Sequence, residues 1–396
     1  MHREDFPILN GDLIYFDNSA TTLKPKCVVD KVVEYYTDYT ANAHRGDYDN
    51  SLRVDKEYED VRNKVGKLIN CNPNEVIFTS GTTDSLNMVV FGYMKNHLKE
   101  GDEVLLTKAE HASNLLPWIR LSEEIGIKIK YIDLDNHLVT VDNVKKSISD
   151  KTKVISLAQI TNVLGDIRPI KEITKLAHEN GILMVVDGAQ SVPHIKVDVK
   201  ELDIDFLAFS AHKMLGPTGV GVLYGKYSLL EELEPVRVGG GMNATFDSTG
   251  ACEYKSIPNR FEAGTPNIAG VIGLGKAIDY ILEIGIDNIA KYELELKKYF
   301  LDKVKDIDNI TIYNSDTESG IIAFNIDDVF SQDTAVYLNH YKICVRAGNH
   351  CAKMLKEDLD VKNTCRISFY LYNTKEEIDK VIEVLKDNKN IFNVIL

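Results

Sequence analysis

Cys351 lies in the segment RAGNHCAKM (346–354), where glycine, amide, imidazole and cationic side chains surround the thiol. Such a cysteine can be a nucleophile, a metal ligand or a packing residue. A packing cysteine is expected among apolar neighbours, and Gly348, Asn349 and His350 are not apolar. A metal site needs further ligands at a suitable spacing, and the adjacent His350 and Cys351 have none nearby. The segment therefore favours a nucleophile, with no metal.

A second segment, TSGTTDSLN (79–87), places a Gly-Thr-Thr turn between a predicted strand and a predicted helix. Such a turn directs unpaired backbone N–H groups and hydroxyls toward an anion. The structural alternative is a capped helix start, with Thr83 or Asp84 as the cap. The spacing of a nucleotide-binding P-loop is absent.

A third segment, ILMVVDGAQS (182–191), delivers Asp187 at the end of an apolar predicted strand. In open α/β sheets this end of a strand faces the ligand crevice. A buried carboxylate needs a partner, and a protonated pyridine nitrogen would supply one. The alternative is a helix N-cap.

A fourth segment, FLAFSAHKMLGPTGVG (206–221), carries Ser210, His212 and Lys213 directly after another apolar strand. Burial there lowers the pKa of a lysine and makes its amine nucleophilic, although a solvated loop lysine is the commoner outcome for any single position. An anion-binding turn, a strand-end aspartate and a strand-end Ser-x-His-Lys together describe an aldehyde cofactor with a phosphate and a ring nitrogen.

Seven predicted strands must position these groups. They cover 75–80, 103–107, 127–134, 153–160, 182–187, 206–210 and 220–225, and they alternate with amphipathic or turn-bounded segments. This pattern is typical of an α/β fold with one large, mainly parallel sheet covered by helices.

The chain beyond about residue 265 has a different pattern, with long charged helices such as 286–304 and predicted strands at 311–314 and 320–326. Thr374 and Glu377 form a capping box for a final helix. The apolar residues of that helix lie on one face, at Ile378, Val381, Ile382 and Leu385. We therefore predict a smaller C-terminal α/β domain.

The composition narrows the class of protein. The 396 residues carry a formal net charge of −14, which argues against a nucleic acid or an anionic membrane as partner. The N-terminal MHREDFPILNGD is not a secretory signal, and no segment approaches the about 20 apolar residues that span a bilayer. The six cysteines form no C-x-x-C pair, so we expect no disulfide framework. These features predict a cytoplasmic enzyme of small molecules.

Ten motifs along almost the whole chain are similar to those of one enzyme family. They are YFDNSATT, NAHRG, SGTTDSLN, AEHASNLLPW, TNVLGDIRPI, VDGAQS, SAHKMLGPTGVG, RFEAGTP, VRAGNHCA and CRISFYLYNT, in family order. The chain thus resembles the cysteine desulfurases of the pyridoxal-phosphate class V aminotransferase family, and most closely the Suf-type, selenocysteine lyase-like group with a short R-x-G-x-H-C loop. The resemblance implies the fold type I of pyridoxal-phosphate-dependent transferases. It also implies a large cofactor-binding domain at 17–268 and a small domain at 269–396, which carries the cysteine loop and packs with residues 1–16.

The resemblance also implies which residues hold pyridoxal phosphate. Lys213 links to it covalently, Asp187 pairs with its ring nitrogen and Gln190 contacts its phenolate oxygen. His111 stacks on the ring, with a tautomer and charge that the sequence leaves open.

The same resemblance assigns the phosphate to Thr83, Ser210 and His212 of one subunit. Thr265 reaches it across a dimer interface, which implies a homodimer with shared active sites.

The implied substrate site consists of Asn162, Arg346 and Arg366, with Arg366 binding the substrate carboxylate through a bidentate fork. Taken singly, the residues of these sites also have structural interpretations, such as a satisfied histidine, a turn residue or a surface ion pair. One cofactor accounts for all of them together.

The implied activity converts L-cysteine to L-alanine and transfers the sulfur to Cys351 as a persulfide. Lys213, Cys351 and His111 are the expected catalytic residues, and Arg346 and His350 are candidates for lowering the pKa of the thiol. A persulfide-acceptor protein would pass the sulfur to iron–sulfur cluster assembly or to another sulfur-transfer pathway.

Two alternatives remain at this point. A selenocysteine lyase would need the cofactor site but not Cys351, and a non-catalytic sulfur-carrier scaffold would need neither Lys213 nor Asp187. The chain also departs from many relatives, which have a second histidine where Asn349 stands and another near the position of Tyr48.

Overall fold

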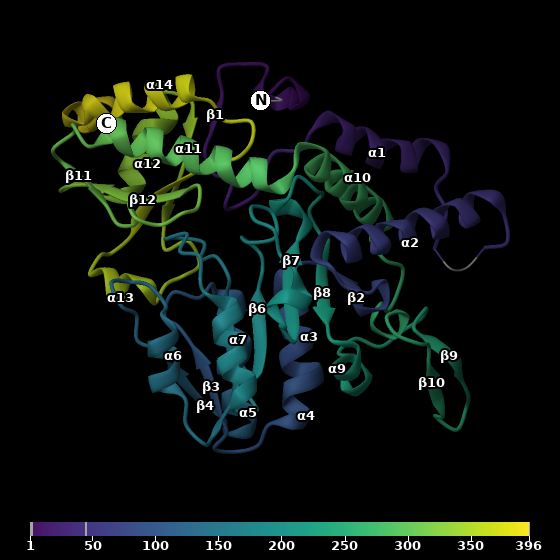
Figure 1. The fold of residues 1–396 in the computed structure, drawn as a ribbon. Coiled ribbons are helices and arrows are strands. Elements are labelled where there is room, and N and C mark those ends of the chain that lie inside the picture. Colours follow the sequence, from purple (N-terminus) through teal and green to yellow (C-terminus); the bar gives the residue numbers. More distant parts are fainter. Residues whose placement is uncertain (1–2, 44–45, 396) are drawn as a thin grey trace.

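A seven-stranded sheet forms the centre of the larger part of the molecule (Figure 1). The computed structural model describes residues 3–43 and 46–395. The strand order is β2-β8-β7-β6-β5-β3-β4, and β8 alone runs antiparallel to its two neighbours. The strands are β2 (Val76–Thr79), β3 (Glu103–Leu106), β4 (Lys128–Tyr131), β5 (Thr152–Ala158), β6 (Leu183–Asp187), β7 (Phe206–Ser210) and β8 (Gly221–Gly225). All seven predicted strands are confirmed.

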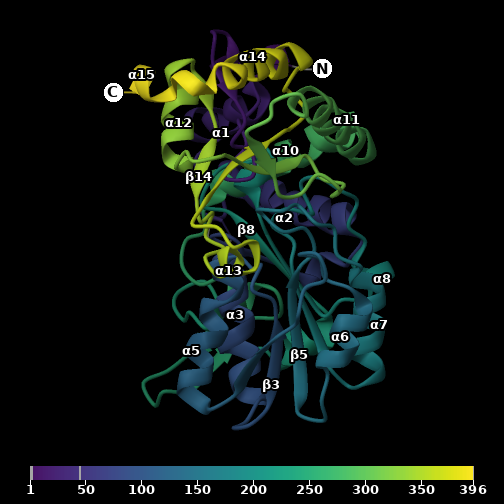
Figure 2. The same ribbon diagram turned by 90° about the vertical axis from the view of Figure 1, so that its left-hand side faces the viewer.

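Helices cover both faces of this sheet (Figure 2). One face packs against α2, α6, α7 and α10, and the other against α3, α5 and α9. The helices of this part are α1 (Lys26–Asp38), α2 (Asp49–Ile69), α3 (Thr82–Met88), α4 (Lys95–His97), α5 (Leu116–Ile125), α6 (Val141–Ser147), α7 (Ile170–Glu179), α8 (Val199–Leu202), α9 (Tyr227–Glu232) and α10 (Ile268–Ile284). A hairpin of β9 (Asn243–Phe246) and β10 (Cys252–Tyr254) extends from it.

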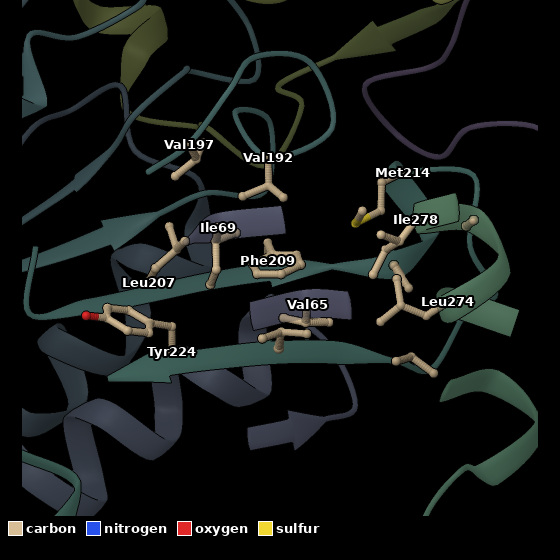
Figure 3. Packing of buried hydrophobic residues seen from close by; sticks show 14 of the residues in the cluster. Val65, Ile69, Val192, Val197, Leu207, Phe209, Met214, Tyr224, Leu274 and Ile278 are labelled. Carbon is tan, nitrogen blue, oxygen red and sulfur yellow. The ribbon is translucent and has the colours of Figure 1, made fainter. Parts of the chain in front are cut away.

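The side chains of the central strands alternate between these two helical layers because successive residues of a strand point to opposite faces. Leu207 and Phe209 of β7 belong to the cluster under α2 and α10, whereas Phe206 and Ala208 belong to the cluster on the other side. Figure 3 shows the first cluster, in which the labelled side chains include Val65, Ile69, Leu207, Phe209, Tyr224, Leu274 and Ile278. The double coverage explains why these strands read as continuous apolar runs.

A four-stranded antiparallel sheet forms the C-terminal part, in the order β11-β12-β15-β14. Its strands are β11 (Ile310–Ile312), β12 (Ile321–Ile326), β14 (Arg346–Gly348) and β15 (Thr364–Ser368). Its helices are α11 (Ile286–Val304), α12 (Ser331–His340), α13 (Leu355–Leu359), α14 (Lys375–Lys386) and α15 (Ile391–Ile395). Both halves of the predicted Thr374–Glu377 capping box are present at α14, and the four apolar residues predicted on its face are buried.

The N-terminal segment contacts both parts. Strand β1 (Ile14–Tyr15) pairs in parallel with β13 (Ile343–Cys344), and Phe16 is buried in the core of the C-terminal part. Phe6, however, packs against Tyr372 within the larger core. The segment therefore bridges the two parts.

Helix α10 starts at the boundary expected from the sequence between residues 268 and 269. Its buried side chains lie in the larger core, against α2 and the seven-stranded sheet. Gly285, with φ of +89°, ends α10 and precedes α11. We therefore propose Gly285 as the boundary between the domains.

A polar clamp joins the loop after β5 to the C-terminal part. The Leu164 carbonyl accepts hydrogen bonds from Asn314 Nδ2 at 2.6 Å and Thr317 Oγ1 at 2.9 Å. The buried Lys297 ammonium in turn donates to the Asn314 and Thr317 carbonyls at 2.9 and 2.8 Å. This clamp sets the position of the loop that carries Asn162.

A buried ion network lies beneath the same loop. The side chain of Arg168 is fully buried and pairs with Glu110 and with Asp166. Glu110 also accepts hydrogen bonds from the Ala158 backbone N–H at 2.8 Å and from Asn114 Nδ2 at 2.9 Å. The network joins the end of β5 to the segment that carries His111.

Within the described ranges, no helix is both long and apolar enough to cross a bilayer.

We expect Arg168→Met to lower the free energy of unfolding by about 3–5 kcal/mol, because two buried carboxylates lose their cation. Urea unfolding followed by circular dichroism measures the change. Arg120→Met is the matched control, since Arg120 pairs with Glu124 on the surface and its loss leaves stability almost unchanged. Equal stabilities of the two variants would contradict the importance of the network.

Candidate active site

A cavity of about 210 Å³ opens where the carboxyl ends of β5, β6 and β7 meet the C-terminal part. The last residues of these strands, Ala158, Asp187 and Ser210, all line it. The structure brings together eleven of the site residues expected from the sequence, namely Thr83, His111, Asn162, Asp187, Gln190, Ser210, His212, Lys213, Arg346, Cys351 and Arg366. Residues as far apart in the sequence as Thr83 and Arg366 thus form one site.

Asp187 is the buried anion of the cavity. One of its oxygens accepts a hydrogen bond from the Ala189 backbone N–H at 2.9 Å, and the residue caps no helix. Burial raises its pKa to about 6, although this hydrogen bond and the Lys213 charge act in the opposite direction. A cationic group bound in the cavity would offset the cost of burying this carboxylate.

Lys213 supplies an amine to the same cavity. Burial lowers its pKa to about 8, with Asp187 opposing the shift and Arg366 and Arg346 adding to it. A substantial share of the amine is therefore unprotonated and nucleophilic slightly above neutral pH.

Hydroxyl groups gather at one end of the cavity. Ser210 Oγ accepts from the Thr82 backbone N–H at 2.8 Å and lies 2.7 Å from Thr82 Oγ1, and Thr83 Oγ1 lies 2.7 Å from Ser113 Oγ. Gly81 precedes α3, so neither Thr83 nor Asp84 caps it. His212 lies beside these groups, and burial lowers its pKa to about 4. This neutral, donor-rich end suits a phosphate group.

The structure assigns the charge and tautomer of His111, which the sequence leaves open. Burial, together with the charges of Lys213, Arg366 and Arg346, lowers its pKa to about 4. Its Nδ1 accepts a hydrogen bond from the Ser113 backbone N–H at 3.1 Å. His111 is therefore neutral near pH 7, with its proton on Nε2.

Two arginines form the cationic wall of the cavity. Arg346 and Arg366 are direct cross-strand partners on β14 and β15. Arg366 is buried and donates to the Asn162 carbonyl at 2.6 Å and to Asp17 at 3.1 Å. Like charges directly opposite one another destabilise a sheet, so this pair suits a bound carboxylate.

Cys351 lies on the rim of the cavity, with an exposed side chain. His350 is buried beside it, and burial lowers the pKa of the imidazole to about 3. The ring is therefore neutral at physiological pH and supplies no positive charge to the thiol. Arg346 is the remaining cationic candidate of the two.

Several features differ from the sequence-based picture or extend it. Thr265 does not line this cavity and instead lies in a separate surface hollow with Ser80 and Arg237. The sequence reasoning missed Asp17, whose place beside Arg366 follows a parallel bridge to Ser368. It also missed the lining residues Ser19, Ala20, Thr82 and Ser113, all of which fall inside the quoted motifs YFDNSATT, SGTTDSLN and AEHASNLLPW. His44 and Arg45 of the NAHRG motif lie outside the described residues.

The polar groups of the cavity are only partly satisfied within the chain. Gln190 Oε1, Asn162 Oδ1 and Arg366 Nε are buried without a hydrogen-bond partner among the described residues. Buried polar atoms normally have partners, so these three indicate a polar ligand. A hydroxyl-rich end, a buried carboxylate and an amine of lowered pKa together fit a phosphorylated aldehyde with a basic ring nitrogen.

The chain matches the family model for aminotransferase class-V over residues 14–381. A probable cysteine desulfurase of Halalkalibacterium halodurans is 45% identical, with 98% of this chain and 97% of the relative covered. The apo structure of a cysteine desulfurase from Thermococcus onnurineus NA1 is 38% identical with a TM-score of 0.94, covering 97% of this chain and 96% of that one. The structure of the cysteine desulfurase CsdA of Escherichia coli is 35% identical with a TM-score of 0.93, covering 100% and 98%. Because the match extends over nearly all of the sequence and the fold, this chain belongs to the aminotransferase class-V family.

Proposed function

We propose that this protein is a pyridoxal-phosphate-dependent cysteine desulfurase, which converts L-cysteine to L-alanine and receives the sulfur on Cys351 as a persulfide. The observation that carries this proposal is that an exposed thiol, a lysine of lowered pKa and a buried aspartate line one cavity. The curated relative and the two solved structures described above bear the same activity in their names.

Residues at or just beyond the carboxyl ends of β2, β6 and β7 would hold the cofactor. Lys213 would bind its aldehyde carbon, Asp187 its ring nitrogen and Gln190 its phenolate oxygen. Thr83, Ser210 and His212 would hold the phosphate, joined by Thr82. When bound, pyridoxal phosphate supplies an electron sink next to the substrate amine.

Lys213 is placed to move protons, and His111 is placed beside it to donate a hydrogen bond. The Lys213 amine can take up and release a proton near neutral pH, because its pKa is about 8. His111 presents a neutral imidazole with its proton on Nε2, and Ser113 fixes that tautomer through Nδ1. His111 can therefore donate a hydrogen bond through Nε2 and does not repel Lys213.

Arg366 would bind the substrate carboxylate, with Arg346 and Asn162 beside it. Asp17 and the Asn162 carbonyl hold two of the Arg366 nitrogens, while its Nε has no partner among the described groups. The guanidinium is thus oriented before the substrate arrives, which reduces the entropy lost on binding.

Cys351 would then carry out the sulfur transfer as a thiolate. Its Sγ forms a bond to the sulfur of the bound cysteine while the bond from that sulfur to Cβ breaks. The electron pair stays on the carbon side, where proton uptake completes alanine, and the sulfur remains on Cys351 as a persulfide.

The decisive experiment incubates the cofactor-loaded protein with L-cysteine and measures alanine together with the mass of the Cys351 peptide. We expect one additional sulfur atom on that peptide, and we expect Cys351→Ala to abolish alanine formation because the acceptor is lost. Cys252→Ala is the matched control, since Cys252 is also exposed but lies on β10.

Three outcomes distinguish this proposal from its alternatives. Alanine without added sulfur on Cys351 would contradict it. Release of selenium from selenocysteine by Cys351→Ala, with no activity on L-cysteine, would identify Cys351 as specific to the sulfur reaction. A protein that takes up no pyridoxal phosphate would instead be a non-catalytic sulfur-carrier scaffold.

The lowered pKa of Lys213 predicts a pH dependence for cofactor attachment. Only the unprotonated amine attacks an aldehyde, so the rate rises with pH and levels off above a midpoint of about 8. Borohydride trapping followed by mass spectrometry of the Lys213 peptide measures this rate. Asp187→Asn should move the midpoint downward, because the Asp187 charge raises the pKa of Lys213. A midpoint near that of an ordinary lysine would contradict the assigned role of burial.

We further propose a cytoplasmic homodimer with shared active sites, in which Thr265 contacts the phosphate held by the other subunit. Its exposed position away from the cavity of its own chain supports this assignment.

The persulfide would pass to an acceptor protein, for iron–sulfur cluster assembly or another sulfur-transfer pathway, because Cys351 is exposed on the cavity rim.

Sedimentation should give about twice the chain mass of 44.5 kDa. Thr265→Ala should lower the affinity for pyridoxal phosphate about tenfold through loss of a charge-assisted hydrogen bond, without changing that mass. Equilibrium dialysis measures the affinity. A single-chain mass with full affinity would contradict the shared site.

A further inference from the structure

We propose that His350 is a positioning residue, which anchors the turn carrying Cys351 to strand β15 and so sets the place of the thiol on the cavity rim. This inference rests on the proposed role of Cys351 as the sulfur acceptor. It assigns to His350 a task other than acid–base chemistry or the tuning of charge.

The backbone of this turn has an unusual conformation. Gly348 has φ of +122°, and the two consecutive residues His350 and Cys351 have φ of +49° and +59°. Residues other than glycine rarely adopt this left-handed region of φ, because their Cβ then approaches the following carbonyl oxygen. The Ala352 backbone N–H donates to the Asn349 carbonyl at 2.7 Å and closes a β-turn around these two residues, and contacts with other segments hold this turn in its place.

The imidazole of His350 provides one of the contacts that hold the turn. Its Nε2 lies 3.0 Å from the Thr364 carbonyl oxygen and 2.9 Å from Thr364 Oγ1. Since a carbonyl only accepts hydrogen bonds, the ring proton is on Nε2 and the histidine is the donor. Nδ1 is buried and has no partner among the described residues.

Two further hydrogen bonds hold the backbone carbonyl groups of His350 and Cys351. The His350 carbonyl accepts from Asn162 Nδ2 at 2.7 Å, and the Cys351 carbonyl accepts from the Ala112 backbone N–H at 2.7 Å. The first bond leads to the loop after β5, and the second leads to the residue following His111. Among the described residues, these contacts give the turn three attachments to other segments, and the His350 imidazole is the side chain of the turn that takes part.

Burial separates the roles of the two neighbouring residues. His350 is 5% exposed, whereas Cys351 is exposed. The imidazole donates its Nε2 proton to Thr364, so this proton is directed at strand β15 and not at the substrate. Its contribution is to keep the left-handed turn folded, with the cysteine outward.

Three variants test this inference in the cofactor-loaded protein. His350→Leu removes the donor, His350→Gln retains an amide donor close to the place of Nε2, and Thr364→Val removes one of the two acceptors while preserving shape. His97→Gln is the matched control, because His97 also bonds a backbone carbonyl, that of Tyr93 at 2.8 Å, but lies on α4. Circular dichroism verifies that each variant is folded.

We expect His350→Leu to lower kcat for alanine formation about 10- to 100-fold with little change in KM, because misplacement of the nucleophile affects the reaction rather than substrate binding. His350→Gln should restore most of kcat, Thr364→Val should have an intermediate effect and His97→Gln none. Retention of the parental kcat by His350→Leu, or a failure of His350→Gln to rescue it, would overturn the proposal.

Hydrogen exchange supplies a readout that does not depend on turnover. The Ala112 N–H is protected by the Cys351 carbonyl, so release of the turn should accelerate exchange in peptides covering 110–116 and 348–352. We expect this acceleration in His350→Leu and its reversal in His350→Gln. Unchanged exchange of both peptides in His350→Leu would refute the anchoring. If His350→Leu does not fold, unchanged exchange and an unchanged kcat in Thr364→Val would refute it instead. A parental protein that forms no alanine would refute the proposed function but leave this exchange test valid.

Discussion

Burial of ionisable groups at the carboxyl ends of β5, β6 and β7 is the constraint on which the site depends. Withdrawal from water lowers the pKa of Lys213 and His111 and raises that of Asp187. One physical cause thus yields a nucleophilic amine, a neutral imidazole and a carboxylate in need of a cation. The C-terminal part contributes to this burial, because Arg346, His350 and Arg366 line the same cavity as the strand ends.

The same burial would be costly without compensation elsewhere in the fold. Arg168 neutralises Glu110 and Asp166 beneath the cavity, and Lys297 satisfies carbonyl groups where the two parts of the molecule meet. Both arrangements act on segments that lead directly into the site. Glu110 precedes His111, and the loop clamped at Leu164 carries Asn162. Charges remote from the ligand therefore maintain the geometry that the ligand meets.

The reactive group of the cysteine turn, unlike the buried Lys213 and Asp187, lies at the surface. An exposed thiol on the cavity rim can face both a bound substrate and an external acceptor, whereas a buried thiol would be closed to the acceptor. Exposure, however, removes the packing that fixes most side chains. The contacts of His350, Asn162 and Ala112 with this turn replace that packing, and they connect it to both parts of the molecule.

The sequence by itself determined the seven strands of the large sheet, the capped final helix and most of the residues that line the cavity. It did so because apolar periodicity and local turn chemistry are properties of neighbouring residues, and because ten ordered motifs matched one family. The tertiary structure alone decided the neutral charge of His350, the tautomer of His111 and the pairing of Asp17 with Arg366. It alone also placed α10 with the larger core. Burial and contacts between segments hundreds of residues apart control these features, and neither is a property of a local stretch of sequence.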